Sequence, residues 1–178
     1  MTLKVYTLGL LKNNCYIVID DFNKLCAIID APKPAEEVIK YVKENNLEVK
    51  YILLTHNHFD HTGGLPMLQE AFPNVQVAQS SVSIGEIDIQ AIKTPGHTPD
   101  SVSYYISHEH TLFSGDTLFF ESIGRTDFKG GNLKEELSSI NTKLFALPPQ
   151  TKVYPGHGKP TTIEWEMKHN PYLTIEGA

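Results

Sequence analysis

The stretch THNHFDHTGG, residues 55–64, carries three histidines and one aspartate within six consecutive positions. Imidazole nitrogens and carboxylate oxygens bind transition-metal ions, and one tetrahedral zinc site takes at most four side chains from the whole protein. A single histidine is more often structural or solvated than a ligand, but four such residues in one short loop are difficult to explain in that way. The stretch therefore predicts a metal site, and its density favours more than one ion.

Three further segments each place one potential ligand after an apolar run. They are TPGHTPDS with His97, LFSGDTLF with Asp116, and VYPGHGKP with His157. Loops at the ends of strands often carry the chemistry of a domain, so these residues are expected to complete the site. The predicted metal ligands are His56, His58, Asp60, His61, His97, Asp116 and His157.

The spacing of these residues suggests how they share two ions. In an extended segment, residues i and i+2 point to the same side, so His56 and His58 can bind one ion together. Asp60 and His61 lie past a bend, where the next two glycines allow a tight turn. The expected division gives one ion His56, His58 and His97, gives the other Asp60, His61 and His157, and makes Asp116 the bridge.

Strands dominate the elements that must position these residues. Short β-branched runs bounded by turn residues predict strands at 3–8, 15–20, 24–30, 49–55, 75–80, 86–94, 101–107, 111–120 and 152–158. Amphipathic spacing predicts helices at 32–46, 65–72, 132–147 and 162–169, with Asn132 as the N-cap of the third. The order favours an α/β protein of two packed sheets with helices outside, and residues 1–178 are expected to form one domain.

Composition excludes several classes of function. The net charge is −6 and the 15 Lys and Arg residues are scattered, which disfavours a nucleic-acid partner and a nuclease. Cys15 and Cys26 lie in apolar runs and are expected to be buried, reduced thiols. No apolar run approaches the roughly 18 residues of a membrane span, and MTLKVYTLGLLKNN is unlike a signal peptide. We expect a cytoplasmic protein without a membrane partner, which disfavours a secreted β-lactamase; the oligomeric state is unknown.

Taken together, THNHFDHTGG, GHTPDS, SGDTLF and PGHG resemble the metallo-β-lactamase superfamily over essentially the whole chain. The resemblance implies an αββα sandwich of two mixed β-sheets with outer helices and a metal site along one edge of the sheets. GRTDF at 124–128 resembles both the glyoxalase II-like branch, the hydroxyacylglutathione hydrolases, and the persulfide dioxygenases, whereas the ending PGHGKPTTIEWEMKHNPYL resembles compact glyoxalase II-like proteins best. This sequence ends about 20 residues after His157, without the C-terminal helical domain that helps bind glutathione in that branch, so other thioesters are also expected substrates.

The expected activity is hydrolysis of a thioester such as S-(2-hydroxyacyl)glutathione by a metal-bridging hydroxide. The expected cofactors are two divalent ions, with zinc favoured and iron or manganese compatible with the same ligands. Asp116 bridges the ions, and Asp60 orients the nucleophile or takes its proton. The leaving thiolate has a pKa of about 8.5, so no dedicated acid is required.

Three basic residues are candidates for binding the substrate: Arg125, Lys129 and Lys159. Each also has a simpler interpretation. Arg125 and Asp127 can form an ion pair that holds their loop, and the two lysines can be ordinary solvated surface residues.

Other functions remain open on the sequence. A mononuclear iron dioxygenase acting on glutathione persulfide resembles this chain at His56, His97 and Asp116, and it largely keeps the remaining ligand motif. A lactonase or other esterase would use the same hydroxide on a different carbonyl. A metal-dependent module without catalytic activity is the third class, which the complete set of seven ligands disfavours.

Overall fold

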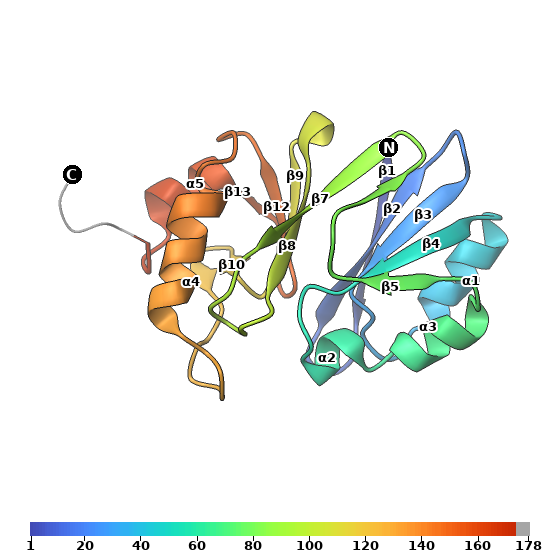
Figure 1. Cartoon of the computed structure of the whole chain (residues 1–178), viewed down its shortest axis with the longest axis horizontal. Coiled ribbons are helices and arrows are strands. Elements are labelled where there is room, and N and C mark those ends of the chain that lie inside the picture. Colours follow the sequence, from blue (N-terminus) through green and yellow to red (C-terminus); the bar gives the residue numbers. More distant parts are fainter. Residues whose placement is uncertain (174–178) are drawn as a thin grey trace. The chain divides into compact units, whose positions relative to one another are not determined.

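The first half of the chain forms a five-stranded sheet in the order β1-β2-β3-β4-β5 (Figure 1). The strands are β1 Thr2–Leu8, β2 Asn13–Asp20, β3 Leu25–Ile29, β4 Glu48–Leu53 and β5 Gln76–Ala78. Short turns join β1, β2 and β3, which pair antiparallel. The pairs β3–β4 and β4–β5 are parallel, and parallel pairing requires the longer helical connections seen here. The sheet is therefore mixed, as the sequence predicted.

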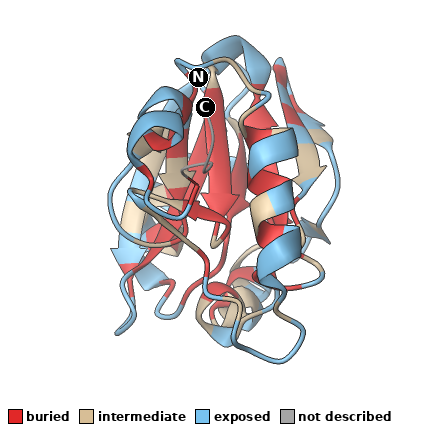
Figure 2. Cartoon of the chain, turned by 90° about the vertical axis from the view of Figure 1, so that its left-hand side faces the viewer, coloured by how far each residue is buried: buried red, intermediate tan, exposed pale blue. Residues whose placement is uncertain are grey.

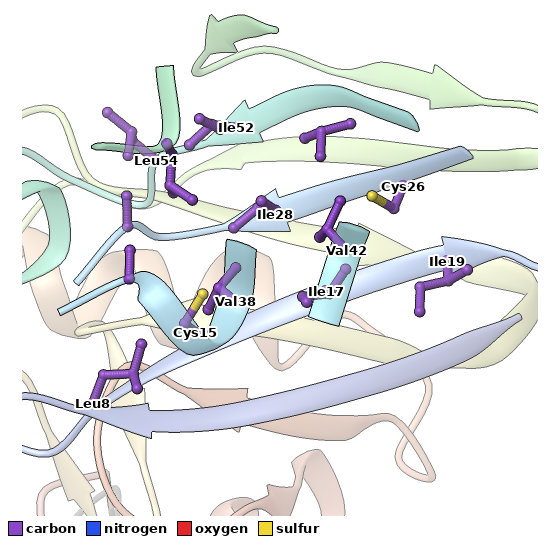
Figure 3. Packing of buried hydrophobic residues seen from close by; sticks show 14 residues of the cluster. Leu8, Cys15, Ile17, Ile19, Cys26, Ile28, Val38, Val42, Ile52 and Leu54 are labelled. Carbon is purple, nitrogen blue, oxygen red and sulfur yellow. The ribbon is translucent and has the colours of Figure 1, made fainter. Parts of the chain in front are cut away.

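Three helices accompany this sheet: α1 Glu36–Glu44, α2 Phe59–Thr62 and α3 Leu65–Ala71. The predicted helix 32–46 begins late because the residue before a proline disfavours helical backbone, and Pro34 follows Lys33. Figure 3 shows Val38 and Val42 of α1 among the buried residues of the sheet, including Ile17 and Ile28. This core fixes the strand ends from which the candidate loops leave.

The second half of the chain is built around β8 Val102–Ile106, β9 Thr111–Gly115, β12 Lys152–Pro155 and β13 Thr161–Thr162. Their order is β13-β12-β9-β8, with β12 parallel to β9 and the other pairs antiparallel. A small hairpin of β10 Leu118–Phe119 and β11 Ser122–Ile123 follows β9. The predicted strand 111–120 is thus interrupted, and Asp116 lies at the interruption.

Two helices, α4 Leu133–Ser139 and α5 Ile163–His169, cover strands of this half. Figure 2 shows their outer faces exposed and the strands behind them buried. Asn132 caps α4 as predicted, because its side-chain oxygen accepts the Glu135 N–H at 3.2 Å. The predicted helix 132–147 continues as a π-helical turn, Ile140–Leu144, with the Phe145 N–H bonded to the Ile140 carbonyl. Ile140 and Leu144 remain buried in the core of this half.

The computed structural model describes residues 1–173, and the chain divides into two compact units, Met1–Gln90 and Ala91–Ala178. The division falls within β7 Ile87–Lys93, which forms a hairpin with β6 Val82–Ile84. Mixed sheets accompanied by helices in both units confirm the predicted α/β class. That residues 1–178 form a single domain stays a prediction. Within residues 1–173, no helix has the length and apolar character needed to cross a membrane.

Candidate metal centre

The loop after β4 brings the first four candidate ligands together in unit 1. His56 and His58 flank Asn57 in extended chain, and the His56 Nε2 atom lies 3.1 Å from the His58 Nδ1 atom. Two nitrogens bound to one tetrahedral zinc ion at 2.0–2.1 Å are roughly 3.4 Å apart, so this separation suits a shared ion. The predicted side-by-side placement of residues i and i+2 is what the structure has.

Asp60 and His61 lie on the single turn of α2. The Asp60 Oδ2 atom is 3.8 Å from the His61 Nε2 atom and accepts a hydrogen bond from the Asn13 side chain at 3.0 Å. The ring centroids of His56 and His61 are 4.1 Å apart, so the two predicted pairs are neighbours. The four side chains of this loop therefore form one dense group of donor atoms.

Gly64 explains why the loop can sit against the end of β3. A Cβ atom on this residue would collide with the Pro32 carbonyl oxygen, and the Gly64 N–H donates to the Ala31 carbonyl at 2.7 Å. Its φ of −90° is ordinary, so close approach, rather than the tight turn expected from the sequence, makes a small residue necessary here.

Asp30, which the sequence analysis did not select, orients two of these histidines. Its carboxylate lies 2.8 Å from the His61 Nδ1 atom and accepts hydrogen bonds from both the Thr55 N–H and the Thr55 hydroxyl. An ionised carboxylate only accepts, so the His61 Nδ1 carries the proton and Nε2 keeps its lone pair for a metal. The Thr55 hydroxyl donates to Asp30 and lies 3.1 Å from the His56 Nδ1, which fixes His56 in the same tautomer.

The loop after β7 places His97 in unit 2. The His97 Nδ1 donates to the main-chain carbonyl of Arg125 at 2.7 Å, so its Nε2 is again the atom that can bind a metal. The His97 N–H donates to the Glu136 Oε2 at 2.8 Å. Gly96, with φ +151°, allows this loop to lie directly on α4, because a Cβ there would strike the Glu136 backbone.

Asp116 and His157 complete the candidate set of unit 2. Asp116 follows β9, and its Oδ2 atom lies 3.7 Å from the His97 Nε2 and 3.5 Å from the His157 Nε2. One carboxylate therefore faces two imidazoles from separate loops. The predicted role of Asp116 as a bridging ligand stays a prediction.

Glu136 is a second residue that the sequence analysis missed. It is fully buried on α4, and burial raises the pKa of its carboxyl group to about 8; the His97 N–H opposes this rise and the charge of Asp116 adds to it. Its position in a polar first turn, LKEEL, resembles that of a solvated residue. Nothing in the sequence distinguishes it from the exposed Glu135.

The basic candidates lie outside this group of donors. Arg125 pairs with Asp127 through two hydrogen bonds of 2.7 Å, and this contact lowers the pKa of Asp127 to about 2. Both side chains are exposed, and the Arg125 guanidinium lies over the Phe128 ring at 4.1 Å. Lys159 similarly lies over the Phe120 ring at 3.5 Å, and Lys129 is an exposed residue of the same loop as Arg125. Their role in substrate binding stays a prediction.

The donor set of each unit fits a divalent metal of the zinc, iron or manganese type, since it combines imidazole nitrogens with carboxylate oxygens. The two cysteines take no part. Both are fully buried, and burial raises the pKa of the Cys15 thiol and raises that of Cys26 to about 12. They are the buried reduced thiols that the sequence predicted.

Comparison with known proteins agrees with the motifs. The family model for the metallo-β-lactamase superfamily matches residues 8–82 and 77–157. The hydroxyacylglutathione hydrolase GloC of Haemophilus influenzae is 30% identical over 97% of this chain and 98% of its own. The crystal structure of BLEG-1, a B3 metallo-β-lactamase, superposes with a TM-score of 0.92 at 36% identity, covering 98% of this chain and 100% of that one. ETHE1 from Myxococcus xanthus superposes with a TM-score of 0.87 at 31% identity, covering 96% and 84%.

These matches cover most of the chain and include the segments that carry all seven candidate ligands. They also confirm the resemblance to hydroxyacylglutathione hydrolases. The chain therefore belongs to the metallo-β-lactamase superfamily and has its α/β fold.

Proposed function

We propose that the two units form one catalytic domain that holds two divalent cations and hydrolyses thioesters such as S-(2-hydroxyacyl)glutathione. In this proposal one cation takes His56, His58 and His97, the other takes Asp60, His61 and His157, and Asp116 bridges them. The observation that carries the proposal is the orientation of the imidazoles: His56, His61 and His97 are each held at Nδ1 by an oxygen, which puts the proton on Nδ1 and the lone pair on Nε2. Zinc is the favoured ion, with iron and manganese as alternatives.

Two cations at such a site would lower the pKa of water towards neutrality and polarise the thioester carbonyl. The residues of this chain supply the rest. Asp60, whose Oδ2 atom is held by the Asn13 amide, orients the attacking water and accepts its proton. Water adds to the carbonyl carbon and the C–S bond breaks, so the immediate products are a carboxylic acid and a thiolate, and the proton held by Asp60 is released to solvent. The sulfur leaves as a thiolate, whose pKa of about 8.5 makes a separate acid unnecessary.

The 30% sequence identity to a hydroxyacylglutathione hydrolase, over nearly the full length of both chains, supports a thioester as the substrate. Glutathione carries carboxylates, and three exposed cations of unit 2, Arg125, Lys129 and Lys159, are the proposed contacts for them. We also propose a cytoplasmic location, where glutathione thioesters would be available.

The test combines metal analysis with a thioesterase assay on the full chain and on His58→Ala. We expect about two ions per wild-type chain, and for His58→Ala a lower metal content with at least a roughly hundredfold loss of S-lactoylglutathione hydrolysis. His108→Ala is the matched control, because His108 is an exposed histidine outside the candidate set, and it should change neither quantity.

A mononuclear iron dioxygenase remains the second candidate, because His56, His97 and Asp116 alone could hold one iron. One iron per chain, oxygen uptake with glutathione persulfide and no thioester hydrolysis would establish that activity in place of the hydrolase. The similarity to a B3 metallo-β-lactamase makes a β-lactam the third substrate to be assayed. Hydrolysis of a chromogenic cephalosporin faster than any thioester would replace the proposed substrate class.

A further inference from the structure

Unit 1 contains a small pocket beside Asp60, and the proposed chemistry leaves open what occupies it. The pocket has a volume of about 170 Å³ and lies between the β1–β2 turn and α2. Three large apolar side chains line it while remaining strongly exposed: Leu10 is 101%, Leu11 56% and Phe59 75% exposed. Isolated apolar residues on a surface are ordinary, but a group of them around a hollow indicates a binding site.

Backbone contacts at Gly9 and Lys12 define the conformation of this turn. Gly9, with φ +71°, starts the turn, and the Lys12 N–H returns to the Gly9 carbonyl at 3.2 Å. A Cβ on Gly9 would approach the Lys33 carbonyl oxygen to 2.7 Å, so the turn lies against the chain after β3. Leu10 and Leu11 are therefore presented by a short constrained turn, and binding there requires little ordering of the chain.

A direct contact connects the pocket to the candidate ligands. Asn13, at the start of β2, lines the pocket and donates its side-chain amide to Asp60 at 3.0 Å. Asp60 lines the pocket as well, and Phe59 is its immediate neighbour on α2. Whatever occupies the pocket lies next to the group proposed to orient the attacking water.

We propose that this pocket binds the apolar acyl chain of the thioester, so that the preferred substrates carry acyl groups of about six carbons rather than short hydroxyacyl groups. The inference rests on the proposed thioesterase function. Two observations identify the acyl chain rather than the thiol as the occupant. Three of the lining side chains are large and apolar, and Lys33 is the single cation among the lining residues. The polar lining residues Asn13, Lys33 and Asp60 are too few to replace the hydration of glutathione, which carries two carboxylates and an ammonium group.

The size of the pocket agrees with this assignment. An apolar cavity of about 150 Å³ accommodates benzene, so a pocket of about 170 Å³ accepts a chain of roughly six carbons. Each additional methylene that leaves water strengthens binding, until the pocket is filled. Affinity should therefore rise with acyl length and then level off.

The first measurement is binding, because it does not depend on turnover. S-hexylglutathione and S-methylglutathione are thioethers that cannot be hydrolysed, and both are titrated calorimetrically into the metal-loaded full-length protein. We expect the hexyl compound to bind about tenfold more tightly, since its chain is partly buried in the pocket. Equal affinity for the two compounds would overturn the proposal.

Two variants test whether the pocket causes the difference in affinity between the hexyl and methyl compounds. In the double variant Leu10→Ser/Leu11→Ser, both altered side chains are exposed, and the affinity ratio of hexyl to methyl should fall to about two or less. Phe22→Ser is the matched control, because Phe22 is 91% exposed on the β2–β3 turn, outside the residues that line the pocket; its ratio should equal that of the wild type. An unchanged ratio in the double variant, or an equal fall in Phe22→Ser, would overturn the assignment.

A kinetic series separates this inference from the function on which it rests. Hexanoylglutathione and S-lactoylglutathione are compared by kcat/KM, and the hexanoyl thioester should be favoured by about tenfold. Tighter binding of the hexyl compound with no hydrolysis of any thioester would refute the proposed function and leave the pocket assigned. Hydrolysis of both thioesters at similar kcat/KM, with equal binding of the two thioethers, would refute the acyl pocket alone. A dimer in solution that the double variant dissociates would reassign the apolar side chains to an interface between copies.

Discussion

His61 in unit 1 and His97 in unit 2 are held through the same ring nitrogen by different kinds of oxygen. The Nδ1 of His61 faces the buried Asp30 carboxylate at 2.8 Å, whereas the Nδ1 of His97 donates to the Arg125 main-chain carbonyl at 2.7 Å. Both contacts select the tautomer that leaves Nε2 for a metal. The two contacts differ in their sensitivity to substitution, because a point mutation can remove a carboxylate but leaves a main-chain carbonyl in place.

The two units also differ in how many groups depend on one anchor. Asp30 receives the Thr55 N–H, the Thr55 hydroxyl and His61, and through Thr55 it reaches His56. In unit 2, His97 is fixed at two separate points, by the Arg125 carbonyl at its ring and by Glu136 at its backbone N–H. Unit 1 therefore concentrates the positioning of its ligands in one side chain, and unit 2 distributes it.

The largest effect should follow Asp30→Ala. The substitution leaves several buried polar groups without an acceptor, so the free energy of unfolding should fall by about 3 kcal/mol in urea denaturation. Metal affinity should fall by roughly 10- to 100-fold in a competition titration with a chelator. Asp21→Ala, which alters an exposed aspartate on the β2–β3 turn, should change neither quantity appreciably. Full metal affinity in Asp30→Ala would show that the His61 tautomer does not depend on the carboxylate.

A smaller effect is expected for Glu136→Ala. The His97 N–H loses its acceptor and a buried side chain is removed, so the free energy of unfolding should fall by about 2 kcal/mol. The Arg125 carbonyl still orients the ring, so metal affinity should fall less than in Asp30→Ala. Glu136→Gln keeps an oxygen that accepts the His97 N–H and should restore most of both losses, while the exposed Glu135→Ala serves as the control. If Glu136→Ala weakens metal binding more than Asp30→Ala, the contrast between the units is wrong.

Asp20, at the end of β2, is a second aspartate of unit 1 that accepts several hydrogen bonds. Its contribution to the stability of the fold should be lost in acid. The Asn23 side-chain amide, together with the N–H groups of Glu86, Asn23 and Phe22, lowers the pKa of Asp20 to about 2. A depressed folded-state pKa stabilises the fold above the unfolded value near 4, and this stability is lost as pH falls towards 2. The difference in thermal midpoint between wild type and Asp20→Asn should be constant above pH 5 and shrink between pH 4 and 2. Asp21→Asn should show no such pH dependence, and a constant difference down to pH 2 for Asp20→Asn would contradict the anchor.

The smallest effect should come from Arg125→Ala. The variant removes the exposed pair with Asp127 but keeps the carbonyl that accepts from His97, so metal affinity should change by less than about twofold. Asp127→Ala breaks the same pair and is the matched comparison for the chelator titration. A loss of metal affinity in Arg125→Ala alone, near that of Asp30→Ala, would mean that the main-chain contact depends on the side chain after all. A raised KM for glutathione thioesters with unchanged metal content would instead support the proposed substrate contact.

The elements of the fold were predictable where one segment decides its own structure. The continuous apolar runs gave the central strands, and Asn132 marked the start of α4 because its cap is a local hydrogen bond. Interruptions were less predictable. The segment 111–120 is apolar enough to suggest one strand, yet it turns at Asp116, where β9 pairs with β8 and β12 while β10 pairs with β11. The choice between continuing and turning depends on partners distant in the sequence.

The sequence by itself determined the chemistry available to this protein, because the residue types at the seven candidate positions define which donor atoms are offered to a metal. Tertiary structure decided which ring nitrogen of His56, His61 and His97 carries the proton and what holds each ring. Asp30 reaches His61 only because β3 and β4 lie side by side, and Glu136 reaches His97 only because Gly96 lets the loop lie on α4. Each carboxyl group lies more than 30 positions away in the sequence from the histidine that it contacts. No local pattern encodes such a contact, since its energy arises when folding buries the two groups together.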